Sequence, residues 1–265
     1  MFKKSNVNKF IKDWKFWFKL ATMILIFVAI IWDLVVNISN PAKEWIYEYK
    51  PENNEGEPTI IYNSTGAALS YLSFFTVQSN LLVAFWLMIS LIKQEGDHKL
   101  LTTKVSIFVA TYITITMLIF NLVLLPELCI SEPKTSDIHP SNWKGTTWFK
   151  QMTLHLVGPL LFIFYILFFM KTDEAKGTKE FLKNDSLKVM YYPIVYGIYI
   201  LIRAEIRIAM GMPTTGTSTY PYFFMNLRES WYFFIMIVFI LIGLCIGLST
   251  LYNLIISKRI NQKQT

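Results

Sequence analysis

Charged residues are scarce in this sequence of 265 residues, and their scarcity excludes an ordinary soluble domain. Asp, Glu, Lys and Arg make up 16% of the chain and hydrophobic residues 54%, whereas soluble domains carry about 25% charged residues. The chain has two cysteines, Cys129 and Cys245, which lie far apart in the sequence. We therefore expect neither a disulfide framework nor a cysteine metal site.

Sequence motifs of soluble enzymes are missing as well. The chain has no G-x-G-x-x-G, P-loop, H-E-x-x-H, G-x-S-x-G or C-x-x-C pattern. Its three histidines, His98, His139 and His155, fall in separate segments. We therefore expect no cofactor and no metal ion.

Six long apolar stretches are the main feature that the sequence does contain. A helix needs about 20 apolar residues to cross a bilayer, about twice the length of a barrel strand. The sequence therefore predicts an all-α polytopic membrane protein with a single six-helix domain. The predicted spans are about 16–37, 67–92, 103–125, 148–170, 189–212 and 231–256.

The distribution of lysine and arginine predicts the orientation, because cytoplasmic loops are enriched in both. One side carries the larger group: Lys3, Lys4, Lys9, Lys12, Lys15, Lys19, Lys93, Lys99, Lys104, Lys171, Lys176, Lys179, Lys183, Lys188, Lys258, Arg259 and Lys263. The other side carries Lys43, Lys50, Lys134, Lys144, Lys150 and Arg228. Both termini are therefore expected in the cytoplasm of a cell-membrane protein.

The net charge of +7 fits a basic rim beside anionic lipid headgroups and requires no nucleic acid. Membrane lipids are the expected partners, and the oligomeric state is open. The composition resembles that of AT-rich bacterial genomes. The segment after the first span is acidic (Glu44, Glu48, Glu52, Glu55 and Glu57) and rich in Pro, Asn and Gly, which predicts an irregular outer loop.

Polar residues inside the apolar stretches indicate a functional pocket, because ionisable groups in hydrocarbon are costly and usually face the protein interior. Asp33, His155 and Arg203 are the ionisable ones, and Thr76, Gln78 and Asn80 lie in the second span. With a helical rise of about 1.5 Å per residue, Asp33, Thr76, His155 and Arg203 fall in the outer half of the bilayer, and Gln78 and Asn80 lie at a depth similar to that of Thr76.

Helical phase groups some of these side chains, because residues three and four apart share a face. Ser73, Thr76 and Asn80 form one stripe, and Gln78 points elsewhere. Arg203 and Arg207 form another stripe, which suggests a bound anionic group such as a carboxylate.

Structural roles remain open for each of these residues. Arg203 could instead pair with Asp33 or Glu205 and only stabilise the bundle. His155 could simply bond across helices, and Thr76 could bond its own backbone. The aromatics of segment 220–224 could form an interfacial belt or cap a cavity.

Three short segments resemble a bacterial membrane family, the Pr-six-Pr proteins. Phe74-Phe75-Thr76-Val77-Gln78-Ser79-Asn80 is similar to its F-T-x-Q-S-N signature. His155-Leu156-Val157-Gly158-Pro159 is similar to its H-x-x-x-P in the fourth span, and Tyr220-Pro221-Tyr222-Phe223-Phe224 to its Y-P-Y/F before the last span. The order of these segments and the number of spans agree across most of the chain.

That family is distantly similar to the androgen-induced-gene-one type proteins and to the androgen-dependent protein that regulates tissue factor pathway inhibitor. These are six-helix hydrolases of fatty acid esters of hydroxy fatty acids, with an intramembrane threonine and histidine. The resemblance implies Thr76 as nucleophile and His155 as base, acting on a lipid ester.

The remaining polar residues would then assist the reaction. Asn80 or Arg203 would stabilise the oxyanion. Arg203 and Arg207, with Gln78, would alternatively hold the substrate. Asp33 would orient the imidazole or neutralise Arg203.

Two other functions stay open. A polar intramembrane pocket with an arginine also suits a small-solute binding or transport subunit with an anionic ligand, although no pair of Gly/Pro-broken spans is visible. A non-catalytic assembly protein would use the polar layer only to fix helix packing.

Overall fold

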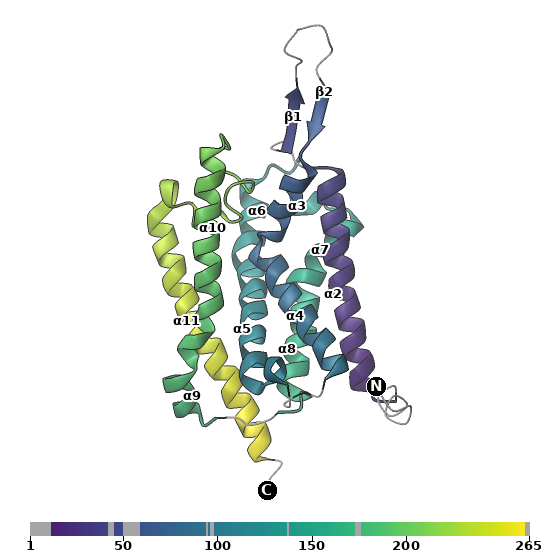
Figure 1. The fold of residues 1–265 in the computed structure, drawn as a ribbon, viewed down its shortest axis with the longest axis vertical. Helices are drawn as coiled ribbons and strands as arrows, with labels where there is room; N and C mark the ends of the chain where they lie inside the picture. Colours follow the sequence, from purple (N-terminus) through teal and green to yellow (C-terminus); the bar gives the residue numbers. More distant parts are fainter. Residues whose placement is uncertain are drawn as a thin grey trace. The chain divides into compact units, whose positions relative to one another are not determined.

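The computed structural model describes residues 12–41, 45–49, 59–93, 95, 98–136, 138–172 and 176–262. The elements (Figure 1) are α2 (Trp14–Ser39), β1 (Ile46–Tyr49), β2 (Thr59–Tyr62), α3 (Ser64–Leu72), α4 (Phe75–Ile92), η2 (Lys99–Leu101), α5 (Thr103–Ile119), η3 (Phe120–Leu124), α6 (Leu125–Ser131), η4 (Pro140–Asn142), α7 (Gly145–Met152), η5 (Thr153–Val157), α8 (Gly158–Phe168), α9 (Thr178–Asn184), η6 (Ser186–Met190), α10 (Tyr191–Ala209), η7 (Phe223–Met225) and α11 (Leu227–Asn261). The segments η3 and η5 are π-helical, and the other η segments are 3₁₀ turns.

Six helices in the described part of the chain are long and apolar enough to cross a membrane, which confirms the predicted number of spans. They are Trp14–Ser39, Phe75–Ile92, Thr103–Ser131, Gly145–Phe168, Ser186–Ala209 and Trp231–Asn261. This architecture is that expected of a multi-pass helical membrane protein.

The second span differs from the continuous helix expected over 67–92, because the chain turns at Ser73 and Phe74 between α3 and α4. The Ser73 amide and hydroxyl both donate to the Ser70 carbonyl, at 3.0 and 2.6 Å. These hydrogen bonds span three residues rather than the four of an α-helix, and they tighten the last turn of α3. Ser73 therefore lies outside α4, and the predicted stripe of Ser73, Thr76 and Asn80 keeps only Thr76 and Asn80 on one helix.

The segment after the first span also differs from the irregular loop that its composition predicts. β1 and β2 form an antiparallel hairpin whose register runs from Ile46 opposite Tyr62 to Tyr49 opposite Thr59. Trp45, just before the hairpin, is buried. Gly66 lies directly against its ring, where an added Cβ would overlap the indole. Glu44, Glu52, Glu55 and Glu57 lie outside the described residues.

The contacts divide the chain into two compact units, each of which we describe by itself. The first unit comprises Met1–Ala29, Ser79–Tyr191 and Leu241–Thr265. The second comprises Ile30–Gln78 and Tyr192–Ile240.

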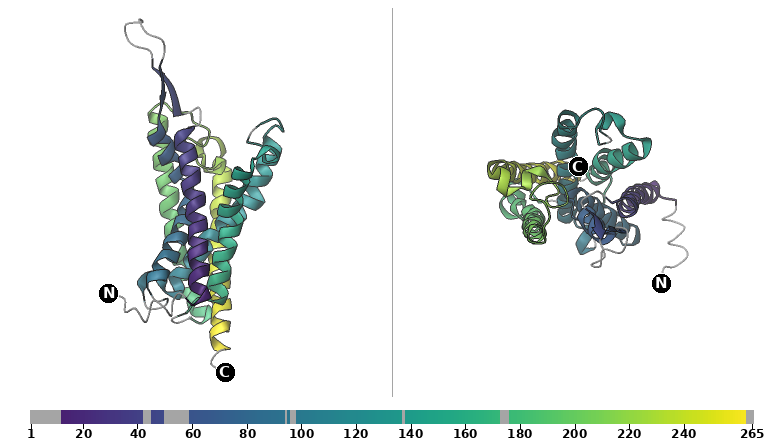
Figure 2. Two further views of the ribbon diagram at one scale, coloured as in Figure 1. Left: turned by 90° about the vertical axis from the view of Figure 1, so that its right-hand side faces the viewer. Right: turned by 90° about the horizontal axis from the view of Figure 1, so that it is seen from above.

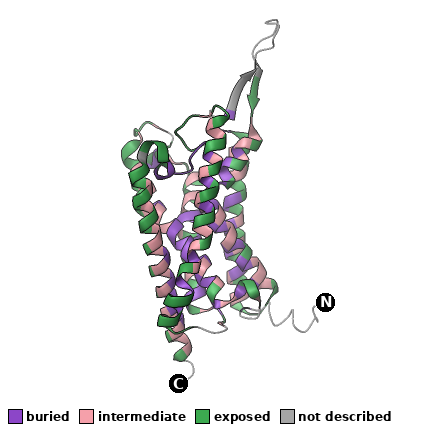
Figure 3. Cartoon of the chain, turned by 60° about the vertical axis from the view of Figure 1, so that its left-hand side comes forward, coloured by how far each residue is buried: buried purple, intermediate pink, exposed green. Residues whose placement is uncertain are grey.

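The core of the first unit lies between α5 and α8, which pack along each other (Figures 1 and 2). Ile107, Ile113 and Phe162 are fully buried there. Most residues of α5 are buried, whereas α11, which ends at the C-terminus marked in Figure 3, is mainly intermediate and exposed. An apolar helix with so little protein cover is typical of a lipid-facing span.

Candidate functional site

The predicted site residues divide between the two units. Asp33, Thr76, Gln78, Arg203 and Arg207 belong to the second unit, and Asn80 and His155 to the first. We therefore describe two polar clusters, the α4-start cluster of the second unit and the π-turn cluster of the first.

In the α4-start cluster, Thr76 occupies the first turn of α4 and is buried. Its amide donates to the Tyr222 hydroxyl at 3.3 Å, and its Oγ1 lies 3.4 Å from the same hydroxyl. The first amides of a helix have no acceptor within the helix. The Tyr222 phenol therefore serves both the amide and the hydroxyl of Thr76.

Tyr196 of α10 stabilises the break that precedes α4. Its hydroxyl donates to the Ser73 carbonyl at 3.0 Å and accepts the Phe75 amide at 3.1 Å. One buried phenol thus pairs a carbonyl on one side of the break with an amide on the other. Apolar surroundings penalise unpaired backbone groups. The two hydrogen bonds of this phenol therefore offset much of the free-energy cost of the interruption.

Gln78 is held on a different side of α4 from Thr76, as its phase predicts. Its Nε2 donates to the Leu72 carbonyl at 3.1 Å, and its Oε1 accepts the Tyr192 hydroxyl at 3.0 Å. Gln78 therefore ties α4 to the end of α3 and to α10, and both ends of its amide are engaged.

Two of the three segments that carry the family resemblance meet in this cluster. The Tyr222 ring packs edge-on against Phe74, with ring centroids 5.8 Å apart, and stacks on Phe224 at 5.2 Å. The aromatic segment 220–224 thus contributes a side chain to the start of α4 as well as apolar surface.

Arg203 binds backbone carbonyls of the loop that leads to segment 220–224. Its two terminal nitrogens donate to the Thr219 carbonyl at 3.0 Å and the Ser218 carbonyl at 3.2 Å. Of the two carboxylates proposed as its alternative partners, Glu205 pairs with Arg228, whose Nε lies 3.3 Å from Glu205 Oε1. Arg203 therefore fixes the loop next to Tyr222.

Arg207 contacts an aromatic ring, and Asp33 interacts electrostatically with a tyrosine. The Arg207 guanidinium sits over the Trp45 ring, 4.1 Å from its centroid, in a cation–π contact. Asp33 is half-buried on α2 and close enough to the Tyr71 phenol to interact with it electrostatically. The Tyr71 hydroxyl donates to the Ile30 carbonyl at 3.2 Å.

In the π-turn cluster, His155 occupies the centre of the π-helical segment η5 and is buried. Its ring stacks on Phe120 of the other π-helical segment, η3, with centroids 3.6 Å apart. Its Nδ1 lies 2.9 Å from the Gln151 carbonyl. A carbonyl only accepts, so Nδ1 carries the proton, and a neutral ring keeps its lone pair on Nε2.

Pro159 explains why two asparagines converge on this turn. An α-helix would pair the His155 carbonyl with the amide of residue 159, but proline has none. Asn121 Nδ2 donates to that carbonyl instead, at 2.9 Å. The Gly158 amide bonds Thr153 rather than Leu154, and Asn80 Nδ2 donates to the Leu154 carbonyl at 2.9 Å.

Gly158 also fits the π turn sterically. An added Cβ would lie 2.7 Å from the Thr153 carbonyl oxygen and 3.2 Å from Ile26 Cγ1. The stretch from His155 to Pro159 therefore has a local structural reason for its glycine and its proline, independent of any catalytic role of the histidine.

Several residues of both clusters were not predicted. Tyr192, Tyr196, Phe120, Asn121 and Gln151 were not singled out, and Tyr222 was considered only within the aromatic segment. Tyr192, Tyr196 and Arg203 share a helical stripe, at spacings of four and seven residues. That stripe could have indicated the two tyrosines. The amide of Asn121 in an apolar stretch could have indicated the asparagine.

Comparison with known proteins gives one partial match. A family model described as "Protein of unknown function (DUF1600)" matches residues 148–263. The matched region contains His155, Pro159, Arg203 and Tyr222 and begins after Thr76. No curated protein and no solved structure matches the chain.

Proposed function

We propose that this chain is an intramembrane hydrolase of lipid (fatty acid) esters, with Thr76 as nucleophile and His155 as base. The observation that carries the proposal is the position of Thr76 at a helix start inside a span. There its hydroxyl lies 3.4 Å from the Tyr222 hydroxyl. A phenol donor in this position can stabilise an alkoxide or an oxyanion better than water does.

The chemistry assigned to His155 follows from its tautomer. With Nδ1 donating to Gln151, Nε2 can accept a proton. Thr76 Oγ1 attacks the ester carbonyl carbon as its proton passes to Nε2. The bond to the alcohol then breaks, and the imidazolium returns the proton to the leaving oxygen. Water repeats the sequence, releasing the fatty acid and restoring the threonine hydroxyl.

The other residues have supporting roles in this proposal. The Tyr222 hydroxyl accepts the Thr76 amide, so its own proton can be donated to the oxyanion. Arg203 keeps the Tyr222 loop in place through two carbonyls. Thr76 and Asn80 lie one turn apart on α4, and Asn80 bonds the carbonyl of the residue before His155.

The test is ester hydrolysis by the purified full-length chain in lipid nanodiscs, with a fatty acid ester of a hydroxy fatty acid as substrate. Thr76→Ala and His155→Ala should each abolish turnover, and the double variant should be no worse than either, because the two groups act as a unit. Thr76→Ser should retain activity. Thr111→Ala is the matched control, because Thr111 is also buried and bonds only its own helix at Ile107 among the contacts described.

Full activity in Thr76→Ala would overturn the proposal. A second requirement is that Thr76 and His155 come within reach of each other. A Thr76→Cys/His155→Cys pair should therefore be joined by a short bifunctional thiol reagent that spans the extra reach of the imidazole, whereas a Thr111→Cys/His155→Cys pair provides the comparison. Failure of the first pair to cross-link would contradict the nucleophile–base assignment.

A small-solute binding or transport subunit is the second candidate, and the interruption between α3 and α4 favours it. Transporters commonly place the start of a broken helix at the substrate, where its amides face an anionic group. The test is uptake of a labelled carboxylate into proteoliposomes. Uptake that is lost in Tyr196→Phe but retained in His155→Ala would support this function over hydrolysis.

We also propose the cell membrane as the location, with both termini in the cytoplasm. The excess of lysine at one end of the spans supports this orientation.

A further inference from the structure

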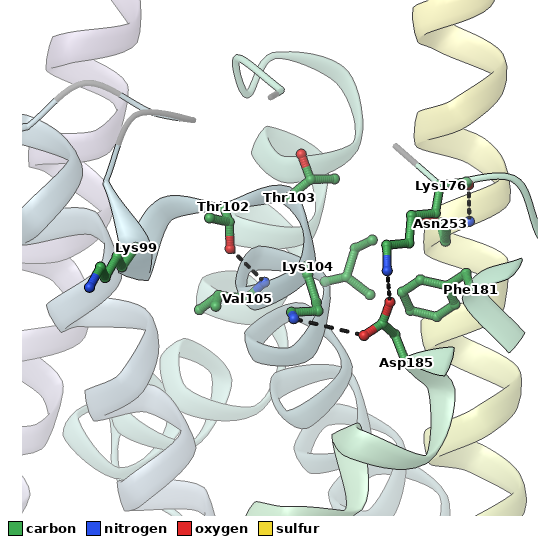
Figure 4. A pocket seen from close by; sticks show the side chains of 10 residues that line it. Lys99, Thr102, Thr103, Lys104, Val105, Lys176, Phe181, Asp185 and Asn253 are labelled. Carbon is green, nitrogen blue, oxygen red and sulfur yellow. Dashed lines mark hydrogen bonds and ion pairs between the residues drawn. The ribbon is translucent and has the colours of Figure 1, made fainter. Parts of the chain in front are cut away.

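A pocket of about 440 Å³ lies at one end of the first unit (Figure 4). Its volume falls within the range of small-ligand sites. The lining residues come from η2, the start of α5, the segment through α9 and the last turns of α11: Lys99, Thr102, Thr103, Lys104, Val105, Ile107, Lys176, Phe181, Asp185 and Asn253. All of them belong to the first unit.

Positive charge dominates this lining. Among the residues that the structure describes, three lysines line the pocket, Lys99, Lys104 and Lys176, against one carboxylate, Asp185. Lys188 lies just outside the lining and also contacts Asp185. The carboxylate thus neutralises only part of the charge that surrounds it.

The geometry shows which lysines satisfy Asp185. Lys176 Nζ lies 2.7 Å and Lys188 Nζ 2.8 Å from its two oxygens, whereas Lys104 Nζ lies 3.7 Å away. In Figure 4, Lys104 and Lys176 turn toward Asp185 from two sides, whereas Lys99 lies apart from them and its ammonium group is directed away from Asp185. The two short pairs already engage both carboxylate oxygens, which leaves Lys104 and Lys99 as the surplus cations.

The position along the spans indicates where a ligand would come from. Thr103 is the first residue of the third span, and Asn253 lies near the end of the sixth. The pocket therefore lies at the level of lipid headgroups. Basic pockets between the ends of membrane helices are typical sites for phosphate-bearing headgroups, and lysine binds phosphate well as a point charge.

We propose that this pocket binds a phosphate-bearing anion, with Lys99 and Lys104 as the principal cationic contacts. Thr102 and Thr103 also line the pocket, and the start of α5 adds its positive end to the site. Asp185 positions the lysine cluster and reduces the repulsion between its charges. This site is separate from both clusters assigned to ester hydrolysis.

The experiment measures binding of two probes to the purified full-length chain. Inorganic phosphate is titrated by calorimetry into the chain in phosphatidylcholine nanodiscs. Phosphatidylglycerol and phosphatidylcholine are compared for retention in native mass spectrometry. Phosphate binding in the first arm identifies a soluble ligand, and selective retention of phosphatidylglycerol identifies a lipid headgroup.

The variants decide whether the pocket is responsible. Lys99→Gln/Lys104→Gln should weaken binding of the active probe by about tenfold or more, because each lysine near a lipid surface contributes about a fivefold factor. Lys179→Gln/Lys183→Gln is the matched control, since it removes the same charge from exposed positions of α9 outside the lining. The control should change binding by less than about twofold.

Lys99→Gln alone is a second variant that leaves every ion pair of Asp185 intact. It should weaken binding by about fivefold, even if the double variant fails to fold. The proposal is overturned if neither probe binds the wild type. It is also overturned if the α9 control loses as much affinity as the pocket variant, since the attraction would then be diffuse.

Discussion

Asp185 and Glu95 are the buried carboxylates among the described residues, and each is surrounded by donors. Glu95 accepts Lys19 Nζ at 2.9 Å, the Tyr165 hydroxyl at 2.6 Å and the Lys171 amide at 2.8 Å. A buried charge is tolerated only when it is paired and hydrogen-bonded. Both residues therefore hold connecting segments against the ends of helices.

The ion pairs of Asp185 predict a pH-dependent stability. Burial alone would raise the pKa of this carboxyl, but hydrogen bonds from Lys176 and Lys188 and the charges of Lys176 and Lys104 outweigh it and lower the pKa to about 2. The unfolded chain has an ordinary pKa near 4. The folded state therefore gains about 2 kcal/mol at neutral pH, and loses it as the pH falls from about 4 through about 2.

Thermal unfolding in detergent checks this prediction. Asp185→Asn should be less stable than wild type at pH 7, and the difference should shrink as the pH approaches 3. Glu180→Gln is the control, because Glu180 is exposed and lies 3.7 Å from Lys176, where ion pairs contribute little. A difference between wild type and Asp185→Asn that is the same at both pH values would contradict the assigned cause.

At the scale of elements, the break between α3 and α4 and the π segments η3 and η5 depart from regular α-helix, and each has a polar side chain at it. Tyr196 bridges the break between α3 and α4. Asn121 donates from η3 to the carbonyl of Met117 at 2.8 Å as well as to His155. Each π segment is followed by an α-helix whose second residue is a proline. Such π turns frequently occur at functional sites.

The Pro159–Asn121 relation predicts a coupling between two substitutions. Asn121→Ala should destabilise the chain by about 1–3 kcal/mol, because it leaves the buried His155 carbonyl without a donor. Pro159→Ala restores an amide at residue 159, which can bond that carbonyl within the helix. Asn121→Ala should therefore cost much less in the Pro159→Ala background.

A double-mutant cycle of unfolding free energies measures this coupling. Asn253→Ala provides the comparison, because Asn253 Nδ2 donates to the Lys176 carbonyl at 3.0 Å, away from the π turn. Its cost should be similar in both backgrounds. Purely additive costs for Asn121→Ala and Pro159→Ala would show that the proline does not create the need for the asparagine.

At the scale of the whole molecule, composition predicted the six spans because burial in lipid selects long apolar stretches directly. The interruptions were not predicted, because the groups that stabilise them are remote in sequence. Tyr196 lies 123 residues from the Ser73 carbonyl that it bonds. The partners of the charged residues could not be predicted from the sequence either. Glu205 pairs with Arg228, 23 residues away, and Arg203 binds loop carbonyls. Polar residues could be placed in a layer, but their partners are determined by tertiary packing.

The orientation in the membrane is also a property of the whole molecule, and it remains a prediction. Lys134 follows α6 at one end of the spans, and Lys179 lies on α9 at the other, lysine-rich end. Both are exposed. In a Cys129→Ser background, which removes the exposed native cysteine, Lys134→Cys should react with an impermeant maleimide in intact cells. Lys179→Cys should react only after permeabilisation, because lysine-rich loops stay in the cytoplasm. The reverse pattern would place the pocket lined by Lys99 and Lys104, which lies with Lys179 at the lysine-rich end, on the outside. The anionic cytoplasmic leaflet could then not supply the proposed ligand.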